Sequence, residues 1–334
     1  MIRVLSLLAL ILYFGAGVYA KNAHLILFYN VENLFDTKDD PRTKDDDNTP
    51  RSKRAYNRKI SNISRVLGDV AAEFGAPPTV IALAEVENRS VLEDLVSSPK
   101  LSSMTYQIIH YNSPDERGID VAMLYSPERF QVKGSRAVRS VTPSQPQYRG
   151  RDILTVWGDM DGEPSFFIVT HWASRLGGVE STQHLRRSSA SQVRSIADSV
   201  IARNPQTKVF IMGDMNDNPT DESLHDILKA RGHIDSLPPR SYYNPFWAIY
   251  NEGYGTTIYK DNWYLFDNII VSANLLDTNT SGLSLQKSAV DARFYGSIFS
   301  RPYLFQRQDY YKHYLWRGYM GGFSDHLPVY VTLE

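Results

Sequence analysis

The sequence contains no cysteine among its 334 residues. It therefore has no disulfide framework, no lipid-bearing cysteine and no thiolate ligand for zinc. It also lacks the glycine-rich loops that bind dinucleotides and nucleoside triphosphates, which argues against enzymes built on those cofactors. Stability must come from a hydrophobic core, and the 42% of residues that are hydrophobic are enough for a large one.

Excess charge of one sign is also missing. With 36 basic and 37 acidic residues the formal net charge is −1. Proteins that bind nucleic acid usually carry a strong positive field instead. One apolar run, 4–17, follows Arg3 and precedes a small-residue site that ends at Ala20. Because the run is shorter than the roughly 20 apolar residues of a membrane span, it predicts a cleaved signal peptide over 1–20 rather than a membrane anchor.

Cleavage near Ala20 would remove one basic residue and no acidic one, which leaves a net charge of −2. We expect the mature protein to be secreted or periplasmic. Length and composition favour one domain over 21–334, and nothing in the sequence implies a stable protein partner, so we expect a monomer.

Four apolar stretches carry polar clusters where sheet proteins place binding and catalytic groups. Carboxylate and amide oxygens without cysteine suit Mg²⁺ or Mn²⁺ better than Zn²⁺. A site with few carboxylates leaves coordination positions for water and a substrate phosphate, so the pattern predicts hydrolysis of a phosphate ester. The clusters contain Asn30, Glu85, Asp214 with Asn216, and Asp325 with His326.

Apolar runs and helical spacing predict nine strands and four helices. Since helices are interspersed among many strands without strict alternation, we expect a mixed sheet or a pair of sheets covered by helices. Residues 37–54, rich in Asp, Lys, Pro and Asn, should form a long loop. The expected strands are 24–30, 80–84, 105–110, 119–125, 153–157, 166–170, 209–212, 266–271 and 329–333, and the expected helices are 58–72, 91–96, 182–202 and 222–230.

Taken in order, these clusters resemble the endonuclease/exonuclease/phosphatase superfamily, from Leu27 to the C-terminus. The opening Phe-Tyr-Asn-Val-Glu-Asn-Leu-Phe-Asp, residues 28–36, further resembles a branch of mostly secreted bacterial members. The resemblance implies an α/β (α+β) fold, a four-layer α/β/β/α sandwich with two mixed β-sheets and a site at one end. Other segments that carry it are Arg-Gly-Ile-Asp-Val-Ala at 117–122, Thr-His-Trp at 170–172, Phe-Asp-Asn at 266–268 and Ser-Asp-His at 324–326.

The resemblance implies that Glu85 binds Mg²⁺ or Mn²⁺, with Asn30 and Asp325 on the metal side of the site. An unpaired carboxylate at the end of an apolar strand would be costly, so Glu85 needs a cation or donors. A structural salt bridge is the alternative for Glu85, and Asn30 could orient water or phosphate.

By the same resemblance, His326 is a general base or transition-state stabiliser and Asp267 holds its tautomer. Neighbouring side chains of an extended segment point apart, so Asp325 and His326 should do different jobs. Asp214 and Asn216, two residues apart, could hold the attacking water and a phosphate oxygen. A simple turn is the alternative for that pair, and whether Asp214 or His326 takes the proton is open.

Three further candidates are less specific. The resemblance implies that His171 donates to the scissile phosphate, although a lone histidine ending an apolar strand is more often a satisfied core residue. Asp120 is a candidate catalytic partner of His171 or a plain salt bridge to Arg117. Arg175 could be a forked phosphate clamp or a solvated loop residue.

The superfamily includes nucleases, sphingomyelinases and inositol phosphate phosphatases, so the fold does not choose a substrate. The last branch is disfavoured because its Trp-Gly-Asp-x-Asn-Tyr-Arg and Cys-Asp-Arg motifs differ here. Aromatic residues in 299–323 could stack bases, form a lipid-facing edge or pack as a rigid loop. We expect a nuclease, with a lipid or sugar phosphoesterase or a catalytically silent binding protein as alternatives. Basic residues that could follow a nucleic acid backbone, or be scattered solubilising charges, are Arg51, Lys53, Arg54, Arg58, Lys59, Arg186 and Arg187.

Overall fold

The computed structural model describes residues 23–44, 52–237, 241–279, 282–305, 314–315, 318–319 and 322–334. The expected signal peptide over 1–20 lies outside these residues, as does much of the aromatic segment 299–323. Within the described ranges, no helix is both long enough and apolar enough to cross a membrane.

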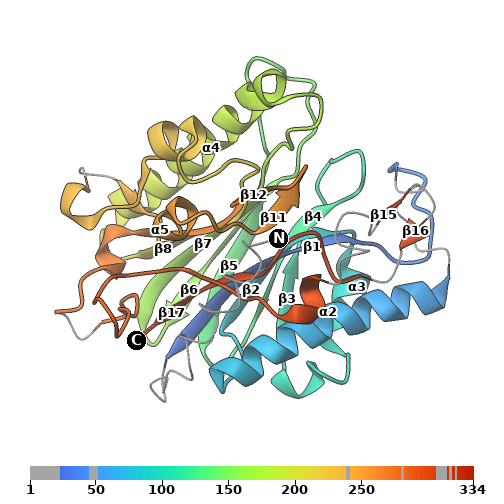
Figure 1. Ribbon diagram of the computed structural model, residues 1–334, viewed down its shortest axis with the longest axis horizontal. Coiled ribbons are helices and arrows are strands. Elements are labelled where there is room, and N and C mark those ends of the chain that lie inside the picture. The colour runs from blue at the N-terminus through green and yellow to red at the C-terminus, as the bar shows by residue number, and fades with distance from the viewer. Residues whose placement is uncertain are drawn as a thin grey trace.

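Two mixed sheets make up the centre of the molecule (Figure 1). In the six-stranded sheet, of order β14-β17-β1-β2-β4-β3, β1 runs parallel to β2 and antiparallel to β17. Its strands are β1 (His24–Leu34), β2 (Val80–Val86), β3 (Gln107–His110), β4 (Asp120–Tyr125), β14 (Ser297–Ile298) and β17 (Val329–Leu333).

In the seven-stranded sheet, of order β5-β6-β7-β8-β13-β10-β9, β8 runs parallel to β7 and antiparallel to β13. Its strands are β5 (Phe130–Val138), β6 (Ile153–Met160), β7 (Glu163–His171), β8 (Lys208–Asp214), β9 (Ala230–Arg231), β10 (Tyr242–Tyr243) and β13 (Asp267–Ser272). Two small hairpins pair β11 (Thr257–Tyr259) with β12 (Asn262–Tyr264) and β15 (Tyr314–Leu315) with β16 (Gly318–Tyr319).

Long helices cover the outer faces, with α2 and α4 on opposite sides of the strands (Figure 1). Helix α2 begins where the Ser52 side chain accepts the Ala55 N–H, and it ends at Gly75 with φ of 80°, a conformation that glycine adopts without steric cost. The helices are α2 (Lys53–Phe74), α3 (Arg89–Val96), α4 (Val179–Arg203), α5 (Trp247–Asn251), the π-helix η2 (Ser223–Ile227) and the 3₁₀ turns η1 (Ser102–Met104), η3 (Ile234–Ser236), η4 (Ala273–Leu275) and η5 (Pro302–Phe305).

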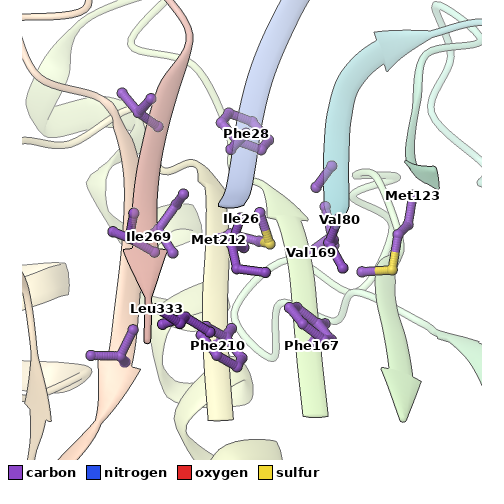
Figure 2. Close-up of a cluster of buried hydrophobic side chains, with 14 of the residues drawn as sticks. Ile26, Phe28, Val80, Met123, Phe167, Val169, Phe210, Met212, Ile269 and Leu333 are labelled. Atoms are coloured by element: carbon purple, nitrogen blue, oxygen red, sulfur yellow. The ribbon is translucent and has the colours of Figure 1, made fainter. Parts of the chain in front are cut away.

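Alternating side chains divide the core into layers. Phe28 of β1 packs in the cluster between the sheets together with Phe167, Phe210 and Met212, as Figure 2 shows, whereas Leu27 packs in the cluster beneath α2. Strands that are buried on both faces read as continuous apolar runs, which is why the sequence pattern located them. The α/β/β/α sandwich with two mixed sheets is confirmed.

Several short elements were not expected, among them β9 to β12, β14 to β16 and α5. Two further differences have a clear physical reason. Strand β5 was not expected, because only alternate positions of this edge strand are apolar and Gly134 interrupts them; the glycine is required, since a Cβ there would lie 2.4 Å from the Trp157 ring. The expected helix 222–230 shrinks to one π-helical segment, because Ala230 already belongs to β9.

Candidate active site

Three adjacent strands of the seven-stranded sheet place His171, Asp214 and Asp267 in one row. His171 at the end of β7 is in register with Asp214 at the end of β8, which in turn pairs with Asp267 at the start of β13. Strands β7 and β8 approach so closely that a Cβ on Gly213 would lie 1.9 Å from the Thr170 carbonyl oxygen. Glycine at this position therefore allows the row to form.

The six-stranded sheet contributes Glu85 through an irregularity in β2. Against β4 the register shifts between Ala84 and Val86, against β1 it shifts between Asn30 and Leu34, and Glu85 has φ of 64°. Strand β2 therefore continues past Glu85, which stands out as an extra, bulged residue rather than as the last residue of the strand.

Left-handed backbone conformations gather at the site. Besides Glu85, φ is 50° at Glu32, Asn33 and Asn216, a region that costs side-chain-bearing residues on the order of 1–3 kcal/mol each. Carboxylates stabilise two of these turns, because Glu85 accepts the Asn33 N–H at 3.0 Å and Asp214 accepts the Asn216 N–H at 2.9 Å. These hydrogen bonds in turn hold the side chains of Glu85 and Asp214 in place.

Asn30 joins the two sheets. Its amide nitrogen donates to Asp214 Oδ2 at 3.0 Å and lies 3.5 Å from Glu85 Oε1, while its amide oxygen accepts the Glu32 N–H at 3.0 Å. Asn30 is therefore oriented as a donor that positions two carboxylates, and its amide oxygen supports the backbone of β1.

His326 forms a short hydrogen bond to Asp267, with 2.7 Å between Nδ1 and Oδ2. Its other nitrogen, Nε2, lies 3.7 Å from Asp214 Oδ2. Burial by itself lowers the pKa of His326, but the carboxylates of Asp267, Asp214 and Asp325 outweigh it and hold that pKa well above its usual value. The imidazole therefore favours its charged form, held by Asp267 as the sequence predicted.

Asp214 lies at the centre of the site. Burial and, to a smaller extent, the charge of Asp267 raise its pKa to about 7, against the opposing charge of His326. The neighbouring His171 is buried, with Nε2 at 3.5 Å from Asp214 Oδ2, and burial followed by the positive charge of Arg151 lowers its pKa well below the usual value. A carboxyl group that titrates near neutrality thus lies between a charged and a neutral imidazole.

Asp120 does not join this group. It accepts from the Ser113 N–H at 2.8 Å and lies 3.0 Å from Nε2 of His110, so its partner is neither His171 nor Arg117. Spacing along the chain could not reveal this pair, because His110 reaches Asp120 only through the pairing of β3 with β4.

Arg175 is not a free phosphate clamp. Its guanidinium donates to the Asn216 carbonyl at 2.8 Å, to Asp217 at 2.7 Å and to Asp221, and it lies 4.7 Å from the ring centroid of Phe266. Two carboxylates therefore occupy it. Arg175 supports the turn that presents Asn216, whose side chain donates to the Trp172 carbonyl at 3.1 Å.

Two of the basic residues considered for nucleic acid binding are buried. Arg186 is fully buried and pairs with Asp217 at 2.8 Å, and Lys59 is 1% exposed and donates to the Phe323 carbonyl. The sequence signal for Lys59 was its place on the apolar stripe of α2, three residues after Tyr56 and four before Ile63. Glu32, a buried carboxyl in β1, was not among the residues predicted for the site.

The residues fit a hard divalent cation. Burial raises the pKa of Glu32 and of Asp325, and neighbouring carboxylates raise both further: Asp325 and Glu85 act on Glu32, and Glu85 acts on Asp325. A cation would relieve this repulsion. Asp214, Asp267 and His326 also offer ligand atoms within 4.8 Å of one another. His326 Nδ1 and Asp267 Oδ2 are hydrogen-bonded to each other, however, and Glu85 and Asp325 are the other carboxylates that could hold an ion.

A family model described as the Endonuclease/Exonuclease/phosphatase family matches residues 25–334. The chain belongs to this family. Its members are metal-dependent phosphodiesterases or phosphatases, which agrees with a buried Asp/Asp/His group at the ends of the strands. Comparison with curated proteins gives no match.

Solved structures with the same fold come from animals and bacteria. D. rerio TDP2 complexed with a single-strand DNA product has 13% identity and a TM-score of 0.56, over 94% of this chain and 100% of that one. The human Nocturnin catalytic domain with bound sulfate has 14% identity and a TM-score of 0.55, over 94% of this chain and 95% of that one. A family member from Bacteroides thetaiotaomicron has 16% identity and a TM-score of 0.56, over 93% of this chain and 94% of that one. Identities this low establish the fold alone.

Proposed function

We propose that this protein is a metal-dependent phosphodiesterase and that its physiological substrate is a nucleic acid. The observation that carries the proposal is the position of Asp214, bound by Asn30 at 3.0 Å and facing both His171 and His326 within 3.7 Å. Such a carboxylate can position a water molecule, and two imidazoles beside it can contact a phosphate.

In the proposed mechanism Asp214 orients the attacking water and accepts its proton, which a pKa near neutrality favours. His326, charged and held by Asp267, stabilises negative charge on the phosphoryl oxygens. His171, neutral and buried, donates a hydrogen bond to a phosphate oxygen. Attack by a positioned water is in line with the leaving group and needs no covalent intermediate.

Glu85 and Asp325 would hold the divalent ion. Mg²⁺ or Mn²⁺ bound there would polarise the phosphoryl group and offset charge on the leaving oxygen. Asn30 contributes by orienting the carboxylates of Glu85 and Asp214.

The substrate proposal is supported by the hairpin of β11 and β12. Thr257 of this hairpin pairs with His326, and the turn presents Tyr259, which is 62% exposed, with the Lys260 ammonium 5.2 Å from its ring centroid. An exposed aromatic ring and a cation on the hairpin that pairs with His326 suit an unpaired base and its phosphate.

One observation favours a lipid phosphoesterase instead. Directly after Arg175, the loop between β7 and α4 exposes Leu176 at 88%, and Val179, the first residue of α4, is 50% exposed. Apolar side chains at the rim of an active site could enter a lipid surface.

The catalytic proposal predicts metal dependence. Purified protein should hydrolyse bis(p-nitrophenyl) phosphate with Mg²⁺ or Mn²⁺ and lose that activity in EDTA, because the site carries more carboxylates than free positive charge. Zn²⁺ should not outperform Mg²⁺, and refilling with Mg²⁺ should restore the rate. Full activity in excess chelator would contradict the metal mechanism.

The substrate proposal predicts a crossed result for two rim variants. Tyr259→Ala should raise KM for single-stranded DNA by about 5- to 100-fold, the usual range for loss of one stacked base, and leave the small diester unaffected. Leu176→Ser should change neither the KM for single-stranded DNA nor the hydrolysis of the small diester. The reverse pattern on sphingomyelin vesicles, with Leu176→Ser weakening hydrolysis, would replace the nuclease by the lipid enzyme.

We further propose that the protein is exported. The run 4–17 between Arg3 and Ala20 supports this. N-terminal sequencing of protein recovered outside the cytoplasm should begin at Lys21, and a mature protein that retains Met1 would contradict cleavage.

A further inference from the structure

Helix α2 reaches the segment that carries Asp325 and His326 through two side chains. Lys59 Nζ donates to the carbonyl oxygen of Phe323 at 2.8 Å, and Asn62 Nδ2 donates to that of Gly322 at 2.6 Å. The two donors lie three residues apart on α2, so they share a face of the helix and can bind two consecutive carbonyl groups.

The other contacts of this segment come from different directions. The Ser324 hydroxyl donates to the Asn30 carbonyl at 2.7 Å and accepts the His326 N–H at 3.1 Å, which ties the segment to β1. On the far side, the Leu327 N–H donates to the Thr256 carbonyl at 2.8 Å. Residues 322–324 form no strand, so α2 supplies hydrogen bonds that a sheet would otherwise provide.

Burying Lys59 is costly. The side chain is 1% exposed on a stripe that otherwise packs Tyr56 and Ile63, and an apolar residue of similar length would pack there at lower cost. Burial lowers the pKa of Lys59, whereas the carboxylates of Glu32, Asp325 and Glu85 favour its charged form. A buried ammonium beneath the acidic side of the site indicates a task other than packing.

We propose that Lys59, assisted by Asn62, is a positioning residue that clamps carbonyls 322 and 323 and thereby holds Asp325 and His326 in their working positions. This inference rests on the proposed phosphodiesterase function. Neither residue contacts the reacting phosphate. Both act through the backbone that precedes the catalytic histidine, where a displacement of about 1 Å can lower a rate by ~100-fold.

The test uses three variants of the full mature chain on the same helix. Lys59→Met keeps the length and removes the ammonium, Asn62→Ala removes the second donor, and Arg58→Met alters an exposed neighbour as the matched control. Hydrolysis of bis(p-nitrophenyl) phosphate gives kcat and KM well below the melting temperature. Hydrogen exchange of a peptide that spans 322–328 reports the segment independently of activity.

We expect Lys59→Met to lower kcat by ~10- to 100-fold and Asn62→Ala by several-fold, with little change in KM, because position rather than substrate binding is lost. Exchange in 322–328 should become faster by ~10-fold or more in both variants. Arg58→Met should match the wild type in both measurements. Lys59→Arg, which keeps a cationic donor, should recover part of the loss.

The outcomes separate this clamp from the function on which it rests. If the wild type hydrolyses no phosphodiester, the proposed function fails, and hydrogen exchange still tests the clamp. If Lys59→Met does not fold, Asn62→Ala decides, since Asn62 is only partly buried. A lower melting temperature with unchanged kcat and unchanged exchange in 322–328 would show an ordinary packing role and overturn the proposal.

Discussion

Asp214 and His326 are coupled, because each responds to the charge of the other. The pKa of Asp214 rises to about 7 and that of His326 rises well above its usual value, and the charge of His326 opposes the shift of Asp214. At neutral pH the imidazole therefore favours its charged form, while the Asp214 carboxyl group is close to its own pKa and can exchange a proton. This division favours Asp214 as the base and His326 as the charged donor.

The dyad of Asp267 and His326 should behave as one unit. His326→Ala should lower kcat by at least ~100-fold, as removal of a catalytic group usually does, and Asp267→Asn should cost less. The double variant should be no slower than His326→Ala alone, because Asp267 acts only through the imidazole. Steady-state kinetics on the small diester give all four rates. Additive losses would mean that Asp267 has a second task.

At the scale of elements, α4 carries two neighbouring arginines with different roles. Arg186 is fully buried against Asp217, whereas Arg187 is half exposed and pairs with Glu222 at 3.0 Å. Backbone contact and solubilising charge, the two alternatives for these arginines, both require exposure, so neither holds for Arg186. Asp217 also binds Arg175, so the buried pair lies behind the turn that presents Asn216.

Replacing each arginine by methionine should separate the two roles. Arg186→Met should lower the free energy of unfolding by about 3–5 kcal/mol, because it leaves Asp217 buried with one partner fewer. Arg187→Met should cost at most about 1 kcal/mol, as exposed pairs do. Urea unfolding measures both, with the slope m as a control for unchanged native structure. Equal losses would contradict the difference in burial.

Element prediction succeeded where a strand is buried on both faces. All nine expected strands occur, because residues such as Phe28 and Met212 belong to continuous apolar runs. Edge strand β5 was not predicted, because its sequence is not a continuous apolar run. The bulge at Glu85 was not predicted either. A run of apolar residues indicates a strand, but it does not reveal a single extra residue within that strand.

At the scale of the whole molecule, chain order identified the members of the site but not their partners. Asn30, His171, Asp214, Asp267 and His326 come together as predicted. The contacts of Asp120 with His110 and of Arg175 with Asp217 depend on how sheets and loops pack, which spacing does not encode.

The two sheets are joined at both ends of β1. At the active-site end Asn30 donates to Asp214, and at the other end the buried His24 lies 2.8 Å from Asp161, in the turn between β6 and β7, and 3.0 Å from Thr79. Burial lowers the pKa of His24, even though its hydrogen bond to Asp161 acts in the opposite direction. The folded protein thus prefers His24 neutral.

This preference predicts how stability depends on pH. Below a pH of about 6.5, where the unfolded histidine takes up a proton, the folded state cannot follow until the pH reaches the lower pKa of His24. The stabilisation by His24 is therefore complete above that pH and is lost as the pH falls, by at most about 1.4 kcal/mol per pH unit. His24→Gln should be less stable than the wild type at pH 8, and the difference should shrink towards pH 5. Urea unfolding at each pH measures it, and because the other titrating groups are common to both proteins, a difference that stays constant or widens on acidification would show that His24 is not neutral in the folded protein.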